Sequence, residues 1–574
     1  MLVVGRSDPR YVQVVSRERR FRLNEYLVVD DPEAGHPRGE VVESLSLNPF
    51  FPEGSGGRMD DDTLSALRAW GFSPEKEELH LARVRILDDL PVPVRVGSRA
   101  RIPAWEEVRD LFPPEGGFFL GLVRGTEEVG REKVPLLEGG KVEERRGVGF
   151  YFPYRLMDRY PHLGIFGGSG SGKSFALRVL LEEIMERRFP CLAFDPHGEL
   201  DFFSSTRPED PHPQFSSLYR VFRVGMEVGV DFSTLTVDEL ARLLGSVGEL
   251  SEGMQAALRQ LFRRGETLEG FQRRIEEAIE KGGSGWMHPD SLNGLLRRLH
   301  GLRLAGLFQG NLRLLEDFLR GRGLAVVRGP LRSLQLFSGY AVDRLYRLRR
   351  RWKEGGGGEW FPPFFVATDE AHHFVPQGEE RFGRARWREV AQEGRKYGVF
   401  LLLATQRPAL LDETVTAQLN TKLVFRTVRQ EDISRVRAET DLAEEELRRL
   451  PYLPSGVAFV SLASWGRSFC IRVRAARTAS PRFRDPFEEL EGEAEGEEEM
   501  LEHLAPHLPL NDWQLLDVAP EISRALGRAV GVDELAEWLE RLFLSGRVEK
   551  RKMEGLGGYE YHLRVMAGLG GMEA

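Results

Sequence analysis

Apolar residues recur along this chain with two different periods, and the change between them divides the chain. Before about residue 150, short runs rich in β-branched and aromatic residues are separated by Gly, Pro and Asp, as in YVQVVS, EYLVVDD, ELHLARVRIL and FFLGLVRG. Such runs are typical of short strands joined by turns. The pattern predicts a small β-barrel or sandwich over residues 1–147, with one helical interruption at Asp61 to Trp70. We expect this domain to serve docking, assembly or substrate guidance.

From Val148 onward, apolar strand-like runs alternate with segments of helical period, which is typical of a parallel sheet covered by helices. This α/β core is expected over residues 148–480. Within it, residues 234–322 have only helical periodicity, which predicts an inserted helical bundle. An acidic linker follows at 481–500. The remainder, 501–574, has helices followed by a basic hairpin, which predicts a winged-helix-like domain that contacts DNA or a partner, or that is a structural cap.

Composition adds limits to this multidomain picture. The 574 residues are 41% hydrophobic and 29% charged, which is ordinary for globular domains. Two cysteines, Cys191 and Cys470, give neither a disulfide framework nor a metal-ligand spacing. No apolar run is long enough for a membrane span, and the N-terminus lacks a secretion signal, so we expect a cytoplasmic protein without a membrane anchor. The net charge of −9 owes much to acid concentrated at 484–500, so nucleic-acid contacts would depend on local arginine patches.

A glycine-rich loop provides the clearest chemistry. The segment GGSGSGKS at 167–174 follows the apolar run LGIF and precedes a helix-forming segment, and this strand, loop and helix context defines a P-loop. Glycines let backbone N–H groups face phosphates, and the helix N-terminus adds partial positive charge. Lys173 should reach the β/γ-phosphates of ATP, and Ser174 should hold Mg²⁺. The expected nucleotide-binding residues are Gly167, Gly168, Ser169, Gly170, Ser171, Gly172, Lys173, Ser174 and Phe175.

Two later strands end in polar residues that complete an ATPase site. FFVATDEAHHF carries Asp369, expected to hold Mg²⁺ beside Ser174, and Glu370, expected to polarise the attacking water. FLLLATQRP ends in Gln406, which can sense the γ-phosphate. His372 and its neighbour His373 have no useful metal spacing and are interpreted as loop or packing residues. The motif DPHGEL, which begins at Asp195, either lies on the ligand-binding edge or caps its strand.

The set GGSGSGKS, DPHGEL, TDEAHHFVP, EGRKYG, ATQRP and QLNTKLVFRT resembles the HerA branch of the HerA/FtsK superfamily of P-loop ATPases. The β-rich N-terminal region and the helical insertion are similar to those of the family. The resemblance implies a RecA-like core in a homohexameric ring that translocates double-stranded DNA, with the nuclease NurA as partner in DNA-end resection. It also implies that Arg395 is inserted by a neighbouring subunit toward the γ-phosphate. One departure is Pro161-His162, where many relatives have Arg-His, so a cis arginine would have to be replaced, with Arg159 nearby.

An ATP-driven, HerA-type DNA translocase is therefore the leading hypothesis. The alternative is a HerA-like ring that scaffolds a different effector in phage defence, supplied as a separate chain. A third hypothesis is an ATP-gated assembly scaffold without steady turnover. A conjugative DNA pump would need a membrane anchor, which the sequence does not indicate.

Overall fold

The computed structural model describes residues 1–48, 61–73, 77–202, 215, 217–282, 288–356, 359–378, 383–479, 499–511, 514–526, 530–553 and 559–563. The chain forms two compact units, Met1–Pro481 and Arg482–Ala574. Most of the predicted acidic linker, residues 481–498, lies outside the described residues. Among the helices that the structure describes, none is both long and apolar enough to cross a membrane.

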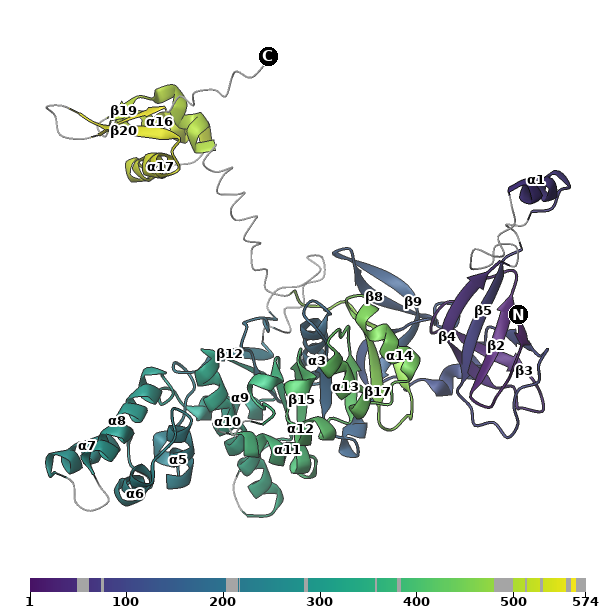
Figure 1. The fold of residues 1–574 in the computed structure, drawn as a ribbon. Helices are drawn as coiled ribbons and strands as arrows, with labels where there is room; N and C mark the ends of the chain where they lie inside the picture. The colour runs from purple at the N-terminus through teal and green to yellow at the C-terminus, as the bar shows by residue number, and fades with distance from the viewer. Residues whose placement is uncertain are drawn as a thin grey trace. The chain divides into compact units, whose positions relative to one another are not determined.

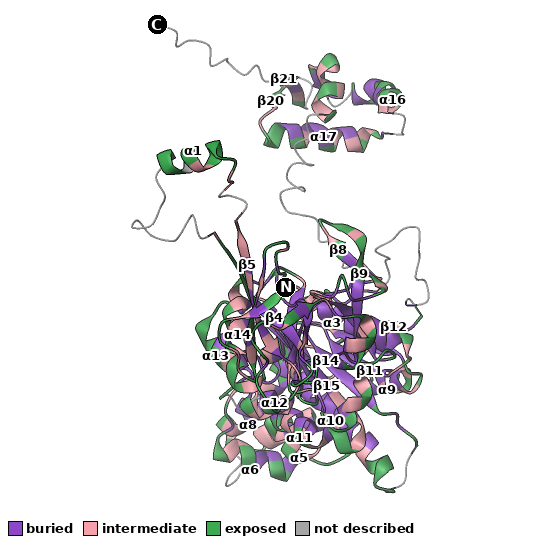
Figure 2. Cartoon of the chain, turned by 90° about the vertical axis from the view of Figure 1, so that its right-hand side faces the viewer, coloured by how far each residue is buried: buried purple, intermediate pink, exposed green. Residues whose placement is uncertain are grey.

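Six antiparallel strands at the N-terminus close into a barrel in the order β1-β2-β5-β4-β3-β6, which confirms the predicted small barrel (Figure 1). Burial alternates along the strands, so that Val12 and Val14 of β2 and Val84 of β5 face a common apolar interior. In Figure 2 the buried positions (purple) gather in the interior of the first unit, and exposed positions (green) lie on its outside. The helix α1 (Asp61–Ala69) lies between β4 and β5 in sequence. The strands are β1 Leu2–Val4, β2 Tyr11–Ser16, β3 Tyr26–Asp30, β4 Arg38–Leu47, β5 Leu79–Ile86 and β6 Arg99–Arg101.

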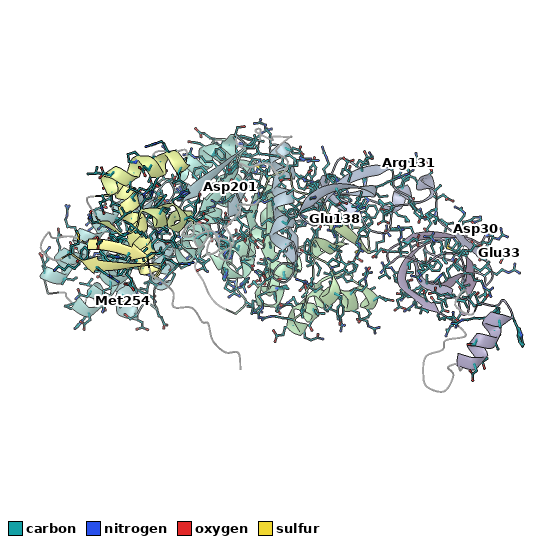
Figure 3. All side chains as sticks on the ribbon, turned by 90° about the horizontal axis from the view of Figure 1, so that it is seen from above. Asp30, Glu33, Arg131, Glu138, Asp201 and Met254 are labelled. Carbon is teal, nitrogen blue, oxygen red and sulfur yellow. The ribbon has the colours of Figure 1, made fainter. Side chains whose placement is uncertain are left out.

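The last part of the predicted barrel segment belongs to another sheet. After the short helices α2 (Trp105–Val108) and η2 (Arg109–Leu111), three strands, β7 Phe118–Val123, β8 Glu132–Glu138 and β9 Lys141–Phe152, extend the core sheet. Strand β7 pairs with β18, and its side chains are buried on both faces, which suits a covered sheet better than a small barrel. Of the residues labelled in Figure 3, Arg131 directly precedes β8 and Glu138 is its last residue. The placement of residues 118–147 in the barrel is therefore corrected.

The core is a mixed sheet of twelve strands in the order β12-β13-β11-β14-β15-β10-β16-β17-β18-β7-β9-β8. The strands from β12 to β16 pair in parallel, and pairing becomes antiparallel from β17 onward. The parallel strands are apolar on both faces because helices cover both sides. Their bounds are β10 Leu163–Phe166, β11 Cys191–Phe194, β12 Tyr219–Arg223, β13 Leu324–Arg328, β14 Phe364–Thr368, β15 Val399–Thr405, β16 Thr421–Val424, β17 Val457–Leu462 and β18 Ser468–Val473.

The helices of the core fall into two groups. Those that alternate with the strands are η3 Tyr154–Asp158, α3 Lys173–Glu186, α10 Leu331–Lys353, η5 Ala371–His373, α11 Arg384–Tyr397, η6 Pro408–Leu410, α12 Glu413–Gln418, α13 Gln430–Glu439, α14 Glu444–Arg449 and η7 Leu450–Tyr452. Between β12 and β13 lies a helical group, seen in Figure 1 as α5 to α9. It comprises η4 Phe232–Thr234, α5 Val237–Gly245, α6 Glu252–Leu261, α7 Leu268–Glu280, α8 Pro289–Leu304 and α9 Leu312–Arg320. Thr236, Ser251 and Thr267 cap three of these helices by accepting a backbone N–H bond.

The barrel is joined to the core by buried charges. Arg85 of β5 donates to Glu40 of the barrel and to Glu446 of α14, with both distances 3.0 Å. Arg449, at the end of α14, donates to the side-chain oxygen of Asn24 at 2.8 Å. These contacts fix α14 against the barrel.

The second unit contains α16 (Leu515–Leu526), α17 (Val532–Leu544) and a three-stranded antiparallel sheet in the order β19-β21-β20. The strands are β19 Leu510–Asn511, β20 Val548–Lys552 and β21 Tyr559–Leu563, and a short η8 (Ala505–His507) precedes them. Ile522, Leu535 and Leu539 belong to the separate apolar core of this unit. Its winged-helix character stays a prediction.

Candidate active site

The P-loop follows β10 and requires glycine for both conformation and space. Gly170 and Gly172 have φ angles of +66° and +101°, a region that other residues rarely adopt. A Cβ atom on Gly167 would lie 2.6 Å from the Phe425 Cβ atom, and one on Gly172 would lie 2.8 Å from the Gly456 backbone nitrogen. The loop therefore packs against the chain that follows β16 and the chain that precedes β17.

Lys173 is the first residue of α3, and its side chain turns toward the end of β14. Lys173 is 4% exposed. Its Nζ atom lies 3.4 Å from Glu370 Oε1 and 3.7 Å from Asp369 Oδ1. Because β14 and β10 both pair with β15, the carboxyl ends of these strands meet at one edge of the sheet. Three of the predicted site residues thus lie together.

Ser174 and Asp369 also meet at this edge. Ser174 Oγ donates a hydrogen bond of 2.6 Å to Asp369 Oδ2. A hydroxyl and a carboxylate are oxygen ligands of the kind Mg²⁺ prefers, and Mg²⁺ usually keeps waters and substrate phosphates as its other ligands. Within the described ranges there is no cluster of three His, Cys, Asp or Glu side chains suited to a metal. The pair therefore fits a Mg²⁺ that is shared with nucleotide phosphates.

Ser171 gives a second observation in favour of a ligand at the loop. Its side chain is fully buried, and its Oγ atom has no hydrogen-bond partner. Buried polar groups nearly always find a partner, so an orphan in this loop points to a polar group that the protein itself does not supply. A phosphate oxygen fits that requirement.

Glu370 is held as an ionised carboxylate. Its Oε2 atom accepts a hydrogen bond from the Gln406 backbone at 3.1 Å and lies 3.3 Å from His372 Nδ1. Burial raises the pKa of Glu370, but the His372 bond, the Lys173 charge and the Gln406 bonds together lower that pKa to about 2. The residue also has a φ angle of +50°, which is uncommon outside glycine and is found at functional sites. The side chain is therefore ionised at neutral pH and can accept a hydrogen bond from a water.

The chain is similar in sequence to proteins named HerA. A family model described as "Helicase HerA, central domain" matches residues 157–291. Two relatives named DNA double-strand break repair helicase HerA align over most of the chain. The protein of Saccharolobus solfataricus is 23% identical over 80% of this chain and 88% of its own, and that of Sulfolobus acidocaldarius is 25% identical over 77% and 86%. The chain is a P-loop ATPase that resembles HerA.

One solved structure to which the chain is similar is VirB4 of Thermoanaerobacter pseudethanolicus. It is 15% identical, covers 64% of this chain and 98% of its own, and has a TM-score of 0.44.

Gln406 follows the central strand β15 of this HerA-like core. Its backbone N–H, and not only its side chain, points to Glu370. The residue before it, Thr405, has its Oγ1 atom 2.9 Å from His372 Nδ1. His372 is thus in contact with both Glu370 and the end of β15. The interpretation of His372 as a loop or packing residue missed this contact, because nothing in the spacing of DEAHH indicates which way the ring turns.

Arg395 lies at the other edge of the sheet. It is exposed, in the last turn of α11, and its Nη1 atom donates to the Arg159 backbone oxygen at 3.2 Å. α11 leads into the beginning of β15, whereas the P-loop and Glu370 follow the ends of strands. Arg395 is therefore separated from the nucleotide site of its own chain by the length of the sheet. Arg159, which precedes β10, lies at the same distant edge.

Arg426 is a site residue that the sequence did not single out. It directly follows β16, which pairs with β10, and its Nη2 atom lies 3.5 Å from the Ser169 backbone oxygen on the P-loop. In the HerA-like motif QLNTKLVFRT it is the only residue with a cationic side chain beyond the strand. The sequence therefore contained a signal for Arg426, because a charged residue at the carboxyl end of a parallel strand is a candidate site residue.

Asp195 of DPHGEL has a structural role. Its two carboxylate oxygens accept the backbone N–H groups of Glu199 and Leu200, each at 3.0 Å, and the Nε of Arg328 at 2.7 Å. These bonds fix the turn after β11. Of the two readings left open for this motif, the structure favours a cap of the strand.

Proposed function

We propose that this protein is an ATP-driven translocase of double-stranded DNA that works as a homohexameric ring with a NurA-like nuclease in DNA-end resection. The relatives named as double-strand break repair helicases support the DNA substrate and the repair role. The barrel offers a domain outside the ATPase core for docking the nuclease. The second unit, a winged-helix-like domain in this proposal, would bind DNA or the partner.

Each site residue has a distinct task in this proposal. Ser174 and Asp369 hold Mg²⁺, which neutralises charge on the phosphates when bound. Lys173 places its ammonium group against the β/γ-phosphates. Glu370 orients the attacking water and accepts its proton, and the Gln406 backbone fixes the carboxylate in that position. Because Gln406 directly follows β15 and bonds to Glu370, the presence or loss of the γ-phosphate at the site would be transmitted to β15.

The main support for a ring assembly is that Arg395 lies far from the nucleotide site of its own chain. An arginine that offsets transition-state charge contributes several orders of magnitude in rate when a partner supplies it. Arg395 is exposed, and its guanidinium group donates a hydrogen bond to the Arg159 backbone oxygen. A head-to-tail interface would bring it to the next subunit's phosphates, and repetition of that interface generates a closed ring. Hydrolysis is then coupled to subunit contacts, as a ring motor requires.

The proposal is tested by ATPase turnover of the full chain with and without duplex ends, together with the mass of the assembly. We expect stimulation by duplex ends and a hexameric mass. Glu370→Gln should bind ATP but lose turnover, whereas Glu252→Gln, at an exposed carboxylate of α6, should behave as the wild type. Retained DNA-stimulated turnover in Glu370→Gln would overturn the assigned chemistry. Purification of the native complex from its source identifies the nuclease.

A further inference from the structure

A pocket of about 570 Å³ opens at the edge of the core sheet where the parallel strands begin. Every lining residue precedes a strand or lies at its start. Aromatic and proline side chains form most of the wall, and Trp360 is 43% exposed. The principal apolar lining residues are Phe189, Pro190, Trp360, Pro362, Phe365 and Phe400.

Arginines surround this pocket. Arg155, Arg188 and Arg322 line its rim and are exposed, and Asp158 is the single carboxylate of the lining. Within the part of the chain that the structure describes, none of the three arginines has a carboxylate within 4.0 Å. Many other arginines of the first unit are in ion pairs. The rim is thus a surface of unneutralised positive charge around an apolar hollow.

The pocket is continuous with the surface that carries Arg395. Arg395 donates to the backbone oxygen of Arg159, one residue after the lining residue Asp158. Gly398, at the end of the same helix, packs closely on Pro363 of the lining, where a Cβ atom on Gly398 would lie 2.8 Å from the Pro363 Cβ atom. Any subunit that receives Arg395 must therefore lie close to the pocket.

Two exposed apolar side chains lie at the nucleotide edge of the sheet. Tyr452, the last residue of η7, is 85% exposed, and Val428 is 67% exposed. Neighbouring residues connect this segment to the chain around the site: the Thr427 N–H donates to the Leu450 oxygen at 3.3 Å, and the Gly456 N–H donates to the Ser171 oxygen of the P-loop at 2.9 Å. Tyr452 is thus on the segment between these two bonds, at the same edge of the sheet as the P-loop, Asp369 and Glu370.

We propose that the pocket receives Tyr452 of the adjacent copy of this chain, so that the pocket and Arg395 dock together against one nucleotide site. Charge complementarity selects this occupant, because the arginine rim would face the carboxylates of that site and the phosphates bound there. The tyrosine ring supplies apolar area to the aromatic wall. This inference rests on the proposed function, since it requires the head-to-tail ring.

Cross-linking of the full-length protein tests the contact directly. A Tyr452→Cys, Trp360→Cys double variant is treated with a short bis-maleimide in the presence of ATP and Mg²⁺. The native cysteines should not react with the maleimide. Cys191 and Cys470 are 0% and 2% exposed, and burial raises the pKa of the Cys470 thiol to about 11. We expect a ladder of covalent oligomers. The matched control is Leu304→Cys with Trp360→Cys, where Leu304 is 89% exposed on α8, and it should give no ladder.

A second measurement separates the contact from folding. Tyr452→Ala should raise the protein concentration needed for assembly by tenfold or more, and Tyr452→Phe should keep assembly close to wild type. The pocket assignment is overturned if the double cysteine variant assembles and hydrolyses ATP but gives no ladder above the Leu304 control. A monomeric wild type with full turnover would instead overturn the proposed ring itself.

Discussion

The ammonium nitrogen of Lys173 lies 3.4 Å from Glu370 Oε1, in a site where both side chains are 5% exposed. A buried ion pair is stable only while both partners are present, because a lone buried charge is costly. A γ-phosphate would compete with Glu370 for the same ammonium group. Binding of a phosphate to Lys173 would therefore release Glu370, the carboxylate that acts on water.

We predict that Lys173→Ala loses both functions together. ATP affinity should fall because the phosphates lose their ammonium partner, and kcat should fall by roughly 10² to 10³. Binding of a fluorescent ATP analogue and steady-state turnover measure the two effects. Lys133→Ala, at a lysine with 77% side-chain exposure, is the control. Unchanged analogue binding by Lys173→Ala would contradict the assigned contact with phosphate.

The sequence predicted the positions of site residues correctly where a short segment contains both the reactive side chain and the strand that places it at the edge of the sheet. Lys173 and Ser174 follow a strand and open a helix, so their side chains point to the carboxyl edge once the sheet is parallel. Asp369 and Glu370 end the strand β14 and reach the same edge for the same reason. The sequence could also indicate the barrel, because turns separate its short strands.

Prediction failed where distant segments come together. Strand β7 has the period of any short strand, and only its pairing with β18 assigns it to the core sheet and not to the barrel. Arg426 reaches the P-loop because β16 pairs with β10, which are far apart in sequence. His372 turns to Glu370 because η5 follows the strained backbone at that glutamate. None of these relationships is present in local periodicity.

We predict that His372 positions Glu370 and does not hold nucleotide. His372→Asn should lower kcat about tenfold, in line with loss of one hydrogen bond to a charged group, and should leave KM for ATP unchanged. His372→Gln should restore part of kcat if its longer side chain reaches the carboxylate. The neighbouring variant His373→Asn should turn over normally. A rise in KM without a fall in kcat would show that His372 acts on binding instead.

Arg426 is predicted to bind phosphate from the side of β16. Arg426→Ala should raise KM for ATP by about tenfold, corresponding to one charge-assisted contact, with little change in kcat. Arg426→Lys keeps the charge and should recover much of the affinity. Exposed Arg437, which pairs with Glu444 at 3.1 Å, supplies the control variant Arg437→Ala. A fall in kcat at unchanged KM would contradict a binding role for Arg426.

His162 makes the stability of the core dependent on pH. Its ring is fully buried between α11 and β15, where Nε2 lies 2.9 Å from the Ala391 oxygen and Nδ1 accepts the Leu401 N–H at 2.9 Å. Burial lowers the pKa of His162 to about 4. In the unfolded chain the pKa of His162 is near 6.5. Between about pH 4 and pH 6.5, His162 is therefore protonated in the unfolded chain and neutral in the folded protein.

The stability from His162 is thus complete above about pH 6.5 and is lost as the pH falls toward 4, by up to about 3 kcal/mol. His162→Gln can keep both hydrogen bonds without titrating, so its free energy of unfolding should fall less steeply in this range. Denaturant unfolding at several pH values measures the difference. His197→Gln, at an exposed histidine, should keep the wild-type slope. Equal slopes for the wild type and His162→Gln would show that another group causes the dependence.

Arg395 and Glu370 should complement one another only across a subunit interface. Arg395→Ala and Glu370→Gln are each expected to be inactive alone, because every site in either ring lacks one group. When the two variants are mixed and reassembled, an Arg395→Ala subunit has an intact Glu370 and can receive Arg395 from a Glu370→Gln neighbour. In a random head-to-tail ring with equal amounts of both variants, about a quarter of the interfaces contain a complete site.

Turnover of the mixed rings should therefore reach a substantial fraction of wild type, unless the ring requires every site to act in sequence. The matched control is wild type mixed with the double variant Arg395→Ala, Glu370→Gln. The double variant supplies neither Arg395 nor Glu370, so only interfaces between two wild-type subunits contain a complete site. Reassembly is verified by mass before turnover is measured. If Arg395 served its own chain, mixing would restore nothing, because each chain would still lack one group. Full activity of Arg395→Ala alone would remove the arginine from the mechanism altogether.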